Sequence, residues 1–350
     1  MSISHIPTLG AVTLCLVASS CSLRNQSAQV SSKTPDTAGL VFVGDIMLAD
    51  RPGKCIARGM DPFNEFAGIL KASDASIGNL ECVVSTKGKP MVGKSWTFQP
   101  NPRVLPMVAR HFDVVSLANN HTGDFGNDAF LEQLDLLDQY HIAHIGGGRN
   151  APEARTPHIL TINGLRIALL AYNEIHPREF EAGPCRPGVA WGVDEQVIAD
   201  VKAARSIHKA DLVIPFMHWG DEHEPVSQRQ RQFARQMIDA GADVIVGSHP
   251  HRTQGAEYYK GKLIVYSLSD FVFDGFKEGP PRYGWLLRLR LDRQGLTTWD
   301  TVVSHVDDDG IPHLEKLTAS PAGDARKGTI GMKRALADSP VRSRVTPHFP

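Results

Sequence analysis

The chain has 350 residues, of which 42% are hydrophobic, so it can form one large domain or two ordinary ones with a full core. Its 37 basic and 38 acidic residues give a formal net charge of -1, which argues against a nucleic-acid-binding surface. The 15 histidines are many for this length, and histidine is the commonest metal ligand in proteins.

The N-terminus predicts export. The apolar run over residues 9–18 is too short for a membrane span, and small residues precede Cys21, as in a bacterial lipoprotein signal. We therefore predict a signal peptide over residues 1–21, with Cys21 lipidated, and a flexible polar tether over residues 22–38. This predicts an envelope lipoprotein anchored on the periplasmic or extracytoplasmic face. A secreted soluble protein and a retained membrane anchor are the alternatives.

Apolar runs alternate with amphipathic segments through the first half of the chain. The predicted strands are residues 39–43, 75–77, 112–117 and 141–145. The predicted helices are residues 61–71, 102–111 and 127–140.

The second half adds hairpins to this alternation. Asn163-Gly164 and Lys260-Gly261 predict two tight turns, the first between strands at 158–162 and 165–170. Further predicted elements are helices at 194–208 and 227–240, strands at 211–217, 243–246 and 263–268, and an antiparallel pair at 283–291 and 296–306. The pattern predicts an α/β domain over residues 39–318 with two packed mixed sheets and helices outside, followed by a peripheral tail over residues 319–350.

Polar side chains follow five of these apolar runs. They are Asp45, the Asn79 and Glu81 pair, the Asn119-Asn120-His121 triplet, His218, and the His249 and His251 pair. In α/β proteins ligands lie beyond the carboxyl ends of the strands, so these residues are expected to share one site. Nitrogen and oxygen donors of this kind suit Zn²⁺, Mn²⁺ or iron, and a bridging carboxylate such as Asp45 would allow two ions.

Six motifs in order, between about residues 40 and 275, resemble the bacterial capsule-synthesis CapA family, the PgsA-like poly-γ-glutamate group of the calcineurin-like metallophosphoesterase superfamily. The motifs are Gly44-Asp45-Ile46-Met47, Gly78-Asn79-Leu80-Glu81, Ala118-Asn119-Asn120-His121, His218-Trp219-Gly220-Asp221-Glu222, Gly247-Ser248-His249-Pro250-His251 and the run from Tyr266 to Phe273.

The resemblance implies a four-layer α/β/β/α sandwich with a dinuclear metal site. The implied metal ligands are Asp45, Glu81, Asn120, His218, His249 and His251. The candidate catalytic residues are His121, Asp45 and Asp270, of which Asp270 is open as a metal ligand, a base or a residue that orients a histidine. The candidate substrate-binding residues are Asn119, Trp219 and Glu222. Two positions depart from the superfamily pattern, because Met47 stands where a histidine is typical and Asp270 where an asparagine is typical.

Several functions follow from this resemblance. The first is a metal-dependent hydrolase that acts on a phosphoester or peptide substrate, such as an anionic γ-glutamyl polymer or an envelope glycopolymer. A metal-independent acid/base enzyme of the epimerase type is a variant of it. The second is a non-catalytic accessory subunit of a membrane polymer synthase or exporter. A periplasmic sugar- or peptide-binding protein is less favoured, because such a protein has no need of five donor-rich loops.

Overall fold

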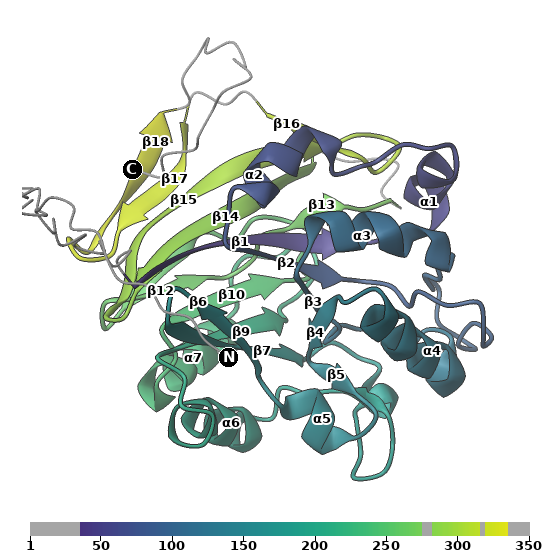
Figure 1. The fold of residues 1–350 in the computed structure, drawn as a ribbon, viewed down its shortest axis with the longest axis horizontal. Coiled ribbons are helices and arrows are strands. Elements are labelled where there is room, and N and C mark those ends of the chain that lie inside the picture. The colour runs from purple at the N-terminus through teal and green to yellow at the C-terminus, as the bar shows by residue number, and fades with distance from the viewer. Residues whose placement is uncertain (1–35, 275–281, 316–318, 335–350) are drawn as a thin grey trace, which may run out of the picture. The chain divides into compact units, whose positions relative to one another are not determined.

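The computed structural model describes residues 36–274, 282–315 and 319–334 (Figure 1). The predicted signal peptide, Cys21 and all but the last residues of the predicted tether lie outside the described residues, as do residues 335–350. In the described part of the chain, no helix is long and apolar enough to cross a membrane.

Two sheets form the centre of the domain. The larger contains β1 (Thr37–Ile46), β2 (Ala75–Leu80), β3 (Val114–Ser116), β4 (Ala143–Ile145), β13 (Asp270–Val272), β14 (Arg282–Asp292), β15 (Gly295–Val306), β16 (Pro312–Leu314), β17 (Ala319–Asp324) and β18 (Thr329–Arg334). Its main path runs β18-β17-β15-β14-β1-β2-β3-β4, with β13 beside β1 and β16 beside β15.

The smaller sheet contains β6 (His158–Ile162), β7 (Leu165–Asn173), β9 (Leu212–His218), β10 (Val244–Ser248), β11 (Ala256–Tyr259) and β12 (Lys262–Val265), in the order β11-β12-β10-β9-β7-β6. A short pair joins β5 (Gly147–Gly148) and β8 (Gly188–Val189). Both sheets mix parallel and antiparallel pairs, as predicted.

The α-helices are α1 (Asp50–Ala57), α2 (Ala67–Lys71), α3 (Leu105–His111), α4 (Gly126–Gln139), α5 (Ala151–Arg155), α6 (Asp194–Ser206) and α7 (Gln228–Ala240). Short 3₁₀ turns are η1 (Asn64–Phe66), η2 (Pro102–Val104) and η3 (Arg178–Phe180). Both ends of α7 are capped, because Ser227 and Gln230 form a capping box and Gly241 closes the helix with a φ of 118°.

Three cores separate four layers. In β1, Val41 and Val43 face a core shared with α1 to α4, whereas Leu40 and Phe42 face the second sheet. Because successive strand residues point to opposite faces, this alternation means that both faces of β1 are covered. The outer face of the smaller sheet packs on α5 to α7 through a third core. The predicted α/β/β/α sandwich is therefore confirmed (Figure 1).

The predicted hairpins are confirmed as well. Asn163 and Gly164 have φ values of 49° and 79°, and Lys260 and Gly261 have values of 48° and 75°. Positive φ at both central residues is typical of a type I′ turn, whose twist matches that of the flanking strands. These turns set the register of β6 with β7 and of β11 with β12.

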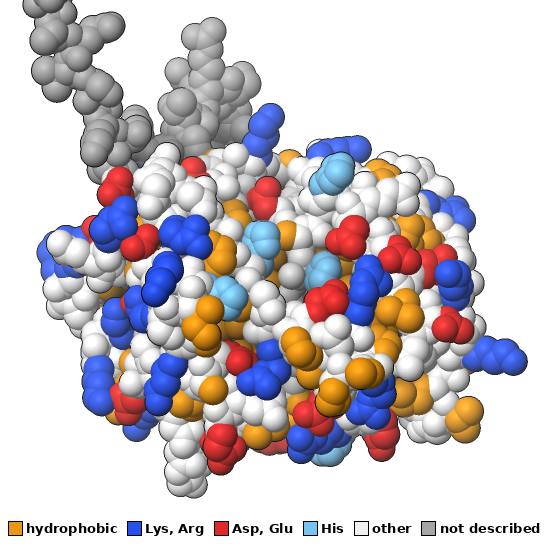
Figure 2. Space-filling model, turned by 60° about the horizontal axis from the view of Figure 1, so that its bottom comes forward, with side chains coloured by type: hydrophobic (Ala, Val, Ile, Leu, Met, Phe, Trp, Pro, Cys, Tyr) orange, Lys and Arg blue, Asp and Glu red, His pale blue; other side chains and the backbone are white. Residues whose placement is uncertain are grey.

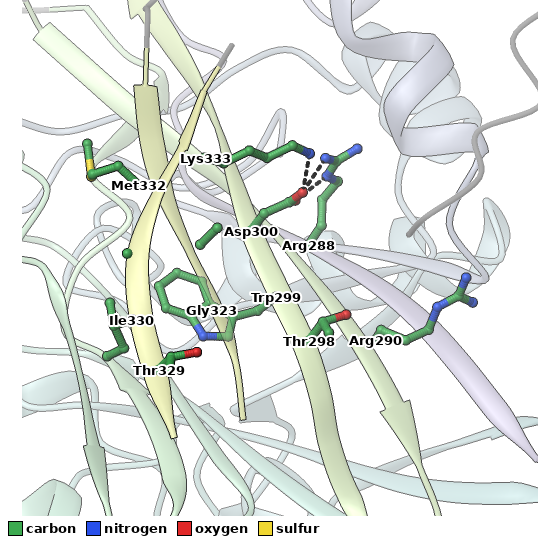
Figure 3. Close-up of a pocket in the computed structure, with 12 residues that line it drawn as sticks. Arg288, Arg290, Thr298, Trp299, Asp300, Gly323, Thr329, Ile330, Met332 and Lys333 are labelled. Carbon is green, nitrogen blue, oxygen red and sulfur yellow. Dashed lines mark hydrogen bonds and ion pairs between the residues drawn. The ribbon is translucent and has the colours of Figure 1, made fainter. Parts of the chain in front are cut away.

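The sequence predicted no elements between residues 319 and 350, but β17 and β18 form a hairpin at the edge of the larger sheet. The hairpin and the strands beside it line a pocket of about 490 Å³, in which Asp300 accepts hydrogen bonds from Arg288 and Lys333 (Figure 3). On the face drawn in Figure 2, basic and acidic side chains are interspersed, as the near-zero net charge suggests.

Candidate metal centre

The candidate site lies where the two sheets meet at the carboxyl ends of their parallel strands. In the larger sheet Asp45 is in register with Asn79 on β2 and with Asp270 on β13, and in the smaller sheet Ser248 is in register with His218. Asn79 connects the sheets, because its Nδ2 atom lies 2.8 Å from Asp45 Oδ1 and 3.1 Å from His218 Nδ1. The strand-exit residues therefore converge, as predicted.

The backbone is tightly packed beneath this cluster. A Cβ atom on Gly44 would lie 1.7 Å from the carbonyl oxygen of Ser269, so only glycine fits. The close approach of Gly44 to Ser269 lets the amide of Asp45 donate to the carbonyl oxygen of Ser269 at 3.0 Å. Ser269, His249 and His251 all have positive φ, at 65°, 96° and 51°. Such conformations are uncommon for non-glycine residues and are found preferentially at functional sites.

Three overlapping groups of buried side chains bring potential metal-binding atoms within 4.8 Å of one another. The groups are Glu81 with His249 and His251, Asp45 with His251 and Asp270, and Asp45 with Glu81 and His218. Because the groups share Asp45, Glu81 and His251, they form one connected cluster. Oxygen and imidazole ligands in this combination fit a first-row divalent ion.

Unpaired polar atoms within the cluster support the same fit. Among the described residues, none makes a hydrogen bond to either Glu81 oxygen, to His249 Nδ1 or to Asp270 Oδ2, although all four atoms are buried. A buried polar atom without a partner is costly, and a bound cation would satisfy these lone pairs. The cluster therefore fits a divalent metal ion.

The electrostatics of the metal-free cluster also favour a cation. Burial raises the pKa of Asp45 to about 6, against its ordinary 3.8. Burial, reinforced by the carboxylates of Asp45 and Asp270, raises the pKa of Glu81 well above its usual range. Burial and the neighbouring histidines lower the pKa of His218 and of His249 well below 6.5. The neutral imidazoles of His218 and His249, beside the carboxyl groups of Asp45 and Glu81, are suited to bind a metal.

His251 and Asp270 form a buried pair. The Nδ1 atom of His251 lies 2.7 Å from Asp270 Oδ1. Burial lowers the pKa of His251, but the charge and the hydrogen bond of Asp270 outweigh burial and raise it to about 9. A carboxylate that accepts from one ring nitrogen fixes the ring orientation of a histidine that binds metal through the other. Asp270 is therefore placed to orient His251.

His121 lies beside this cluster but belongs to none of the three donor groups. Its Nδ1 atom lies 2.8 Å from Asp124 Oδ2, and its Nε2 atom lies 4.0 Å from Glu81 Oε1. A carboxylate only accepts hydrogen bonds, so Nδ1 carries the proton in this pair. The ring also packs on Phe98, with centroids 4.3 Å apart. Asp124 was not among the predicted site residues, although its position three residues after His121 could have suggested the pair.

The other residues of the triplet have different surroundings. Asn120 Oδ1 lies 2.9 Å from His218 Nε2, so Asn120 faces the donor cluster. Asn119 Oδ1 accepts from the backbone amides of His121 and Thr122, both at 3.0 Å, while its Nδ2 donates to Leu80 O. Asn119, which the sequence predicts to bind substrate, therefore holds the turn that carries His121.

Trp219 and Met47 lie in the cores. Trp219, predicted to bind substrate, is fully buried among residues of the third core, and its Nε1 donates to Tyr266 O at 2.9 Å. Met47 is also fully buried, and its sulfur accepts from the amide of Ala49 at 3.2 Å. Glu222, in contrast, is exposed on the loop that follows β9.

Comparisons with known proteins identify the family to which this chain is similar. The family model described as "Bacterial capsule synthesis protein PGA_cap" matches residues 39–275. The chain is 33% identical over 255 residues to the "PGA biosynthesis protein CapA" of Bacillus subtilis, covering 71% of this chain and 67% of that protein. It is 30% identical over 273 residues to the "Capsule biosynthesis protein CapA" of Bacillus anthracis, covering 75% of this chain and 66% of that protein.

The chain thus spans about two thirds of the length of these curated relatives. It is also 29% identical over 248 residues, 66% of this chain and 65% of the relative, to a "Probable polyglutamine synthesis accessory protein" of Mycobacterium tuberculosis. Among solved structures, a phosphatase of Mycoplasma pneumoniae aligns with a TM-score of 0.49 at 13% identity, covering 78% of this chain and 95% of that one.

Proposed function

This chain belongs to the bacterial capsule synthesis protein family PGA_cap, and from that premise we propose that it makes or processes an anionic capsule polymer, such as poly-γ-glutamate, at the cell envelope. The similarity to CapA proteins of two Bacillus species supports this proposal. A membrane polymer synthase or export complex is the partner that such a role requires. We also propose that the lipidated Cys21 anchors the chain, which mass spectrometry of the mature N-terminus would test.

For the reaction, we propose metal-dependent hydrolysis at a phosphoester or carbonyl centre. The observation that carries this proposal is the set of buried, unpartnered donor atoms on Glu81, His249 and Asp270. The residues proposed to hold one or two ions of zinc, manganese or iron are Asp45, Glu81, Asn120, His218, His249 and His251. A divalent ion bound there would supply an activated water and polarise the scissile group.

The protein's own residues would divide the remaining work. Asp124 fixes the proton of His121 on Nδ1, so Nε2 is the atom proposed to exchange a proton with the leaving group. Asp270 holds the ring of His251, and Asn79 holds the carboxylate of Asp45 against the smaller sheet. In this proposal Glu222 contacts substrate from the exposed rim of the site.

Hydrolysis of bis(4-nitrophenyl) phosphate tests this function. We expect no turnover by the metal-stripped chain and recovery when Mn²⁺ or Zn²⁺ is restored. His249→Ala should abolish the recovery, whereas His313→Ala, which changes a half-exposed histidine paired with Asp307, should not. Metal-independent turnover, or full activity of the His249→Ala variant, would contradict the proposal.

A non-catalytic accessory role is the second candidate, and Met47 favours it. Met47 is buried in the core at the position where the superfamily typically has a histidine, so that position offers no imidazole to a metal. In this case the donor cluster would grip an anionic chain for a membrane synthase. Complementation of a strain that lacks the gene separates the two candidates, because polymer output restored by the His249→Ala variant would support the accessory role.

A further inference from the structure

The loop over residues 86–96, beside His121, exposes two large apolar side chains. Val92 is 99% exposed and Trp96 is 62% exposed. Trp191, Trp219 and Trp299 are buried, at 8%, 0% and 3%. Single exposed apolar residues are normal on a protein surface, but an exposed tryptophan and an exposed valine on one short loop require an explanation.

The same loop is basic. Lys87 and Lys89 are exposed near its start, and residues 86–96 include no aspartate or glutamate. The third lysine, Lys94, points inward, where it pairs with Asp124 and donates to Asn120 O at 2.5 Å. The outward-facing part of the loop therefore combines positive charge with apolar surface.

Asp124 holds the loop in this conformation. The amide of Met91 donates to Asp124 O at 2.7 Å, and the amide of Phe98 donates to Asp124 Oδ2 at 2.8 Å. Gln99 Nε2 donates to the carbonyl oxygen of Lys87 at 2.5 Å. The exposure of Val92 and Trp96 thus belongs to a loop that is fixed at several points along its length.

We propose that loop 86–96 docks on an anionic phospholipid bilayer, with Val92 and Trp96 in the interface and Lys87 and Lys89 against the headgroups. Tryptophan is enriched at membrane interfaces, and lysines close to an anionic surface are attracted to it. A hydrated polyanion would also attract the lysines and stack on the indole. A polyanion would have no apolar contact for the fully exposed Val92, so a bilayer fits the loop better than a polyanion does.

Docking of this loop would bring the candidate centre to the membrane. Trp96 is two residues from Lys94 and two from Phe98, and both of these contact His121 or its partner Asp124. Two residues of extended chain span about 7 Å, so the backbone of Trp96 lies within that distance of both. The proposed surface does not depend on catalysis, because none of its outward side chains belongs to the donor cluster.

Quenching of tryptophan fluorescence by acyl-chain-brominated lipid tests the proposal in the full chain. With vesicles of phosphatidylcholine and phosphatidylglycerol, we expect quenching of the wild type. Trp96→Phe should remove most of that quenching but preserve co-sedimentation, because phenylalanine keeps the apolar contact. Lys87→Gln with Lys89→Gln should weaken partitioning about tenfold, since each lysine contributes to attraction by anionic lipid. The matched pair Lys202→Gln with Lys209→Gln, on the opposite layer, should not weaken it.

The comparison of variants in one full-length background separates this loop from any contribution of the N-terminus. Quenching that persists in the Trp96→Phe variant, or vesicle binding by the wild type without quenching, would overturn the proposal. Trp96 quenching by soluble poly-γ-glutamate in the absence of vesicles would overturn it in favour of a polymer platform. His249→Ala should bind vesicles like the wild type, so failure of the proposed hydrolase and failure of membrane docking are distinguishable.

Discussion

His251 Nδ1 lies 2.7 Å from Asp270 Oδ1, and the strand that carries Asp270 pairs in parallel with the strand that carries Asp45. Through this hydrogen bond, a loop of the smaller sheet is fixed to the larger sheet at the candidate centre. The pair also places a negative charge directly behind a proposed metal ligand, which raises the basicity of the imidazole.

Replacing Asp270 should therefore weaken metal binding. Asp270→Asn keeps the side-chain shape but removes the charge, and we expect a 10–100-fold lower affinity for Mn²⁺ or Zn²⁺. Isothermal titration of the metal-stripped chain measures this change. Asp239→Asn, which alters an exposed carboxylate paired with Lys260, serves as the control and should leave the affinity unchanged. Equal metal affinities in the wild type, Asp270→Asn and Asp239→Asn would mean that Asp270 does not affect metal binding.

His121 should matter for turnover but not for metal content. Its Nε2 atom lies 4.0 Å from Glu81 Oε1, and the residue belongs to none of the donor groups. We expect His121→Gln to retain its metal while phosphodiester hydrolysis falls by about 10²–10⁴-fold, the usual contribution of general acid–base catalysis. Elemental analysis and initial rates on the same preparation provide both readouts. Loss of metal together with activity would instead make His121 a ligand.

Stability of the metal-free protein should fall as the pH rises from 6.5 to 9. The pKa of His251 is about 9 in the fold and 6.5 ordinarily, so its stabilising contribution is fully present below pH 6.5 and lost as the pH rises through 9. That shift corresponds to about 3 kcal/mol. Asp45, with a pKa of about 6 against 3.8, binds more protons when folded, so its contribution is fully present below pH 3.8 and lost as the pH rises through 6.

Urea denaturation in EDTA across this pH range measures the effect. His251→Gln should flatten the decline between pH 6.5 and 9. Metal should reverse the trend, because an ion binds the deprotonated ligands and stabilises more at higher pH. A metal-free stability that rises between pH 6.5 and 9 would contradict the assignment of the His251–Asp270 pair.

Gly44 should be intolerant of any side chain. A Cβ atom there would lie 1.7 Å from Ser269 O, so Gly44→Ala must separate β1 from the segment before Asp270. We expect a loss of about 3 kcal/mol in the free energy of unfolding, at the upper end for overpacking. Gly68→Ala is the matched control, since nothing lies within 4 Å of its added Cβ atom in α2. That control should be neutral or slightly stabilising.

Trp219 should behave as a core residue. Trp219→Phe leaves the buried carbonyl of Tyr266 without its 2.9 Å indole donor, so we expect a loss of about 1–3 kcal/mol in stability. The KM for a phosphodiester should not change. A raised KM with unchanged stability would restore Trp219 as a substrate-binding residue.

Much of the fold was predictable because local signals agreed with the final architecture. The turns at Asn163-Gly164 and Lys260-Gly261 specify their hairpins, and Ser227 and Gly241 mark the ends of α7. In contrast, α1 was missed because Pro52 and Gly53 are unfavourable in a helix interior. The helix tolerates this proline in its first turn, where the amide would have no partner.

The candidate site was partly predictable for a similar reason. Polar residues at strand exits identify a ligand-binding edge, but only the folded chain shows which strands meet there. The pairing of Asp270 with His251 depends on β13 returning beside β1, a contact between segments about 220 residues apart along the chain. The burial of Trp219 was not predicted, because it follows His218 directly, whereas successive residues of an extended chain point to opposite faces.

Equilibrium dialysis of the full chain against Mn²⁺ or Zn²⁺, followed by elemental analysis, tests the central claim most directly. If the buried donor cluster is a metal centre, the wild type should retain one or two ions per chain. His249→Ala should retain fewer, and the His313→Ala control should match the wild type. A wild-type chain that retains no ion, or a His249→Ala chain that retains as much as the wild type, would contradict it.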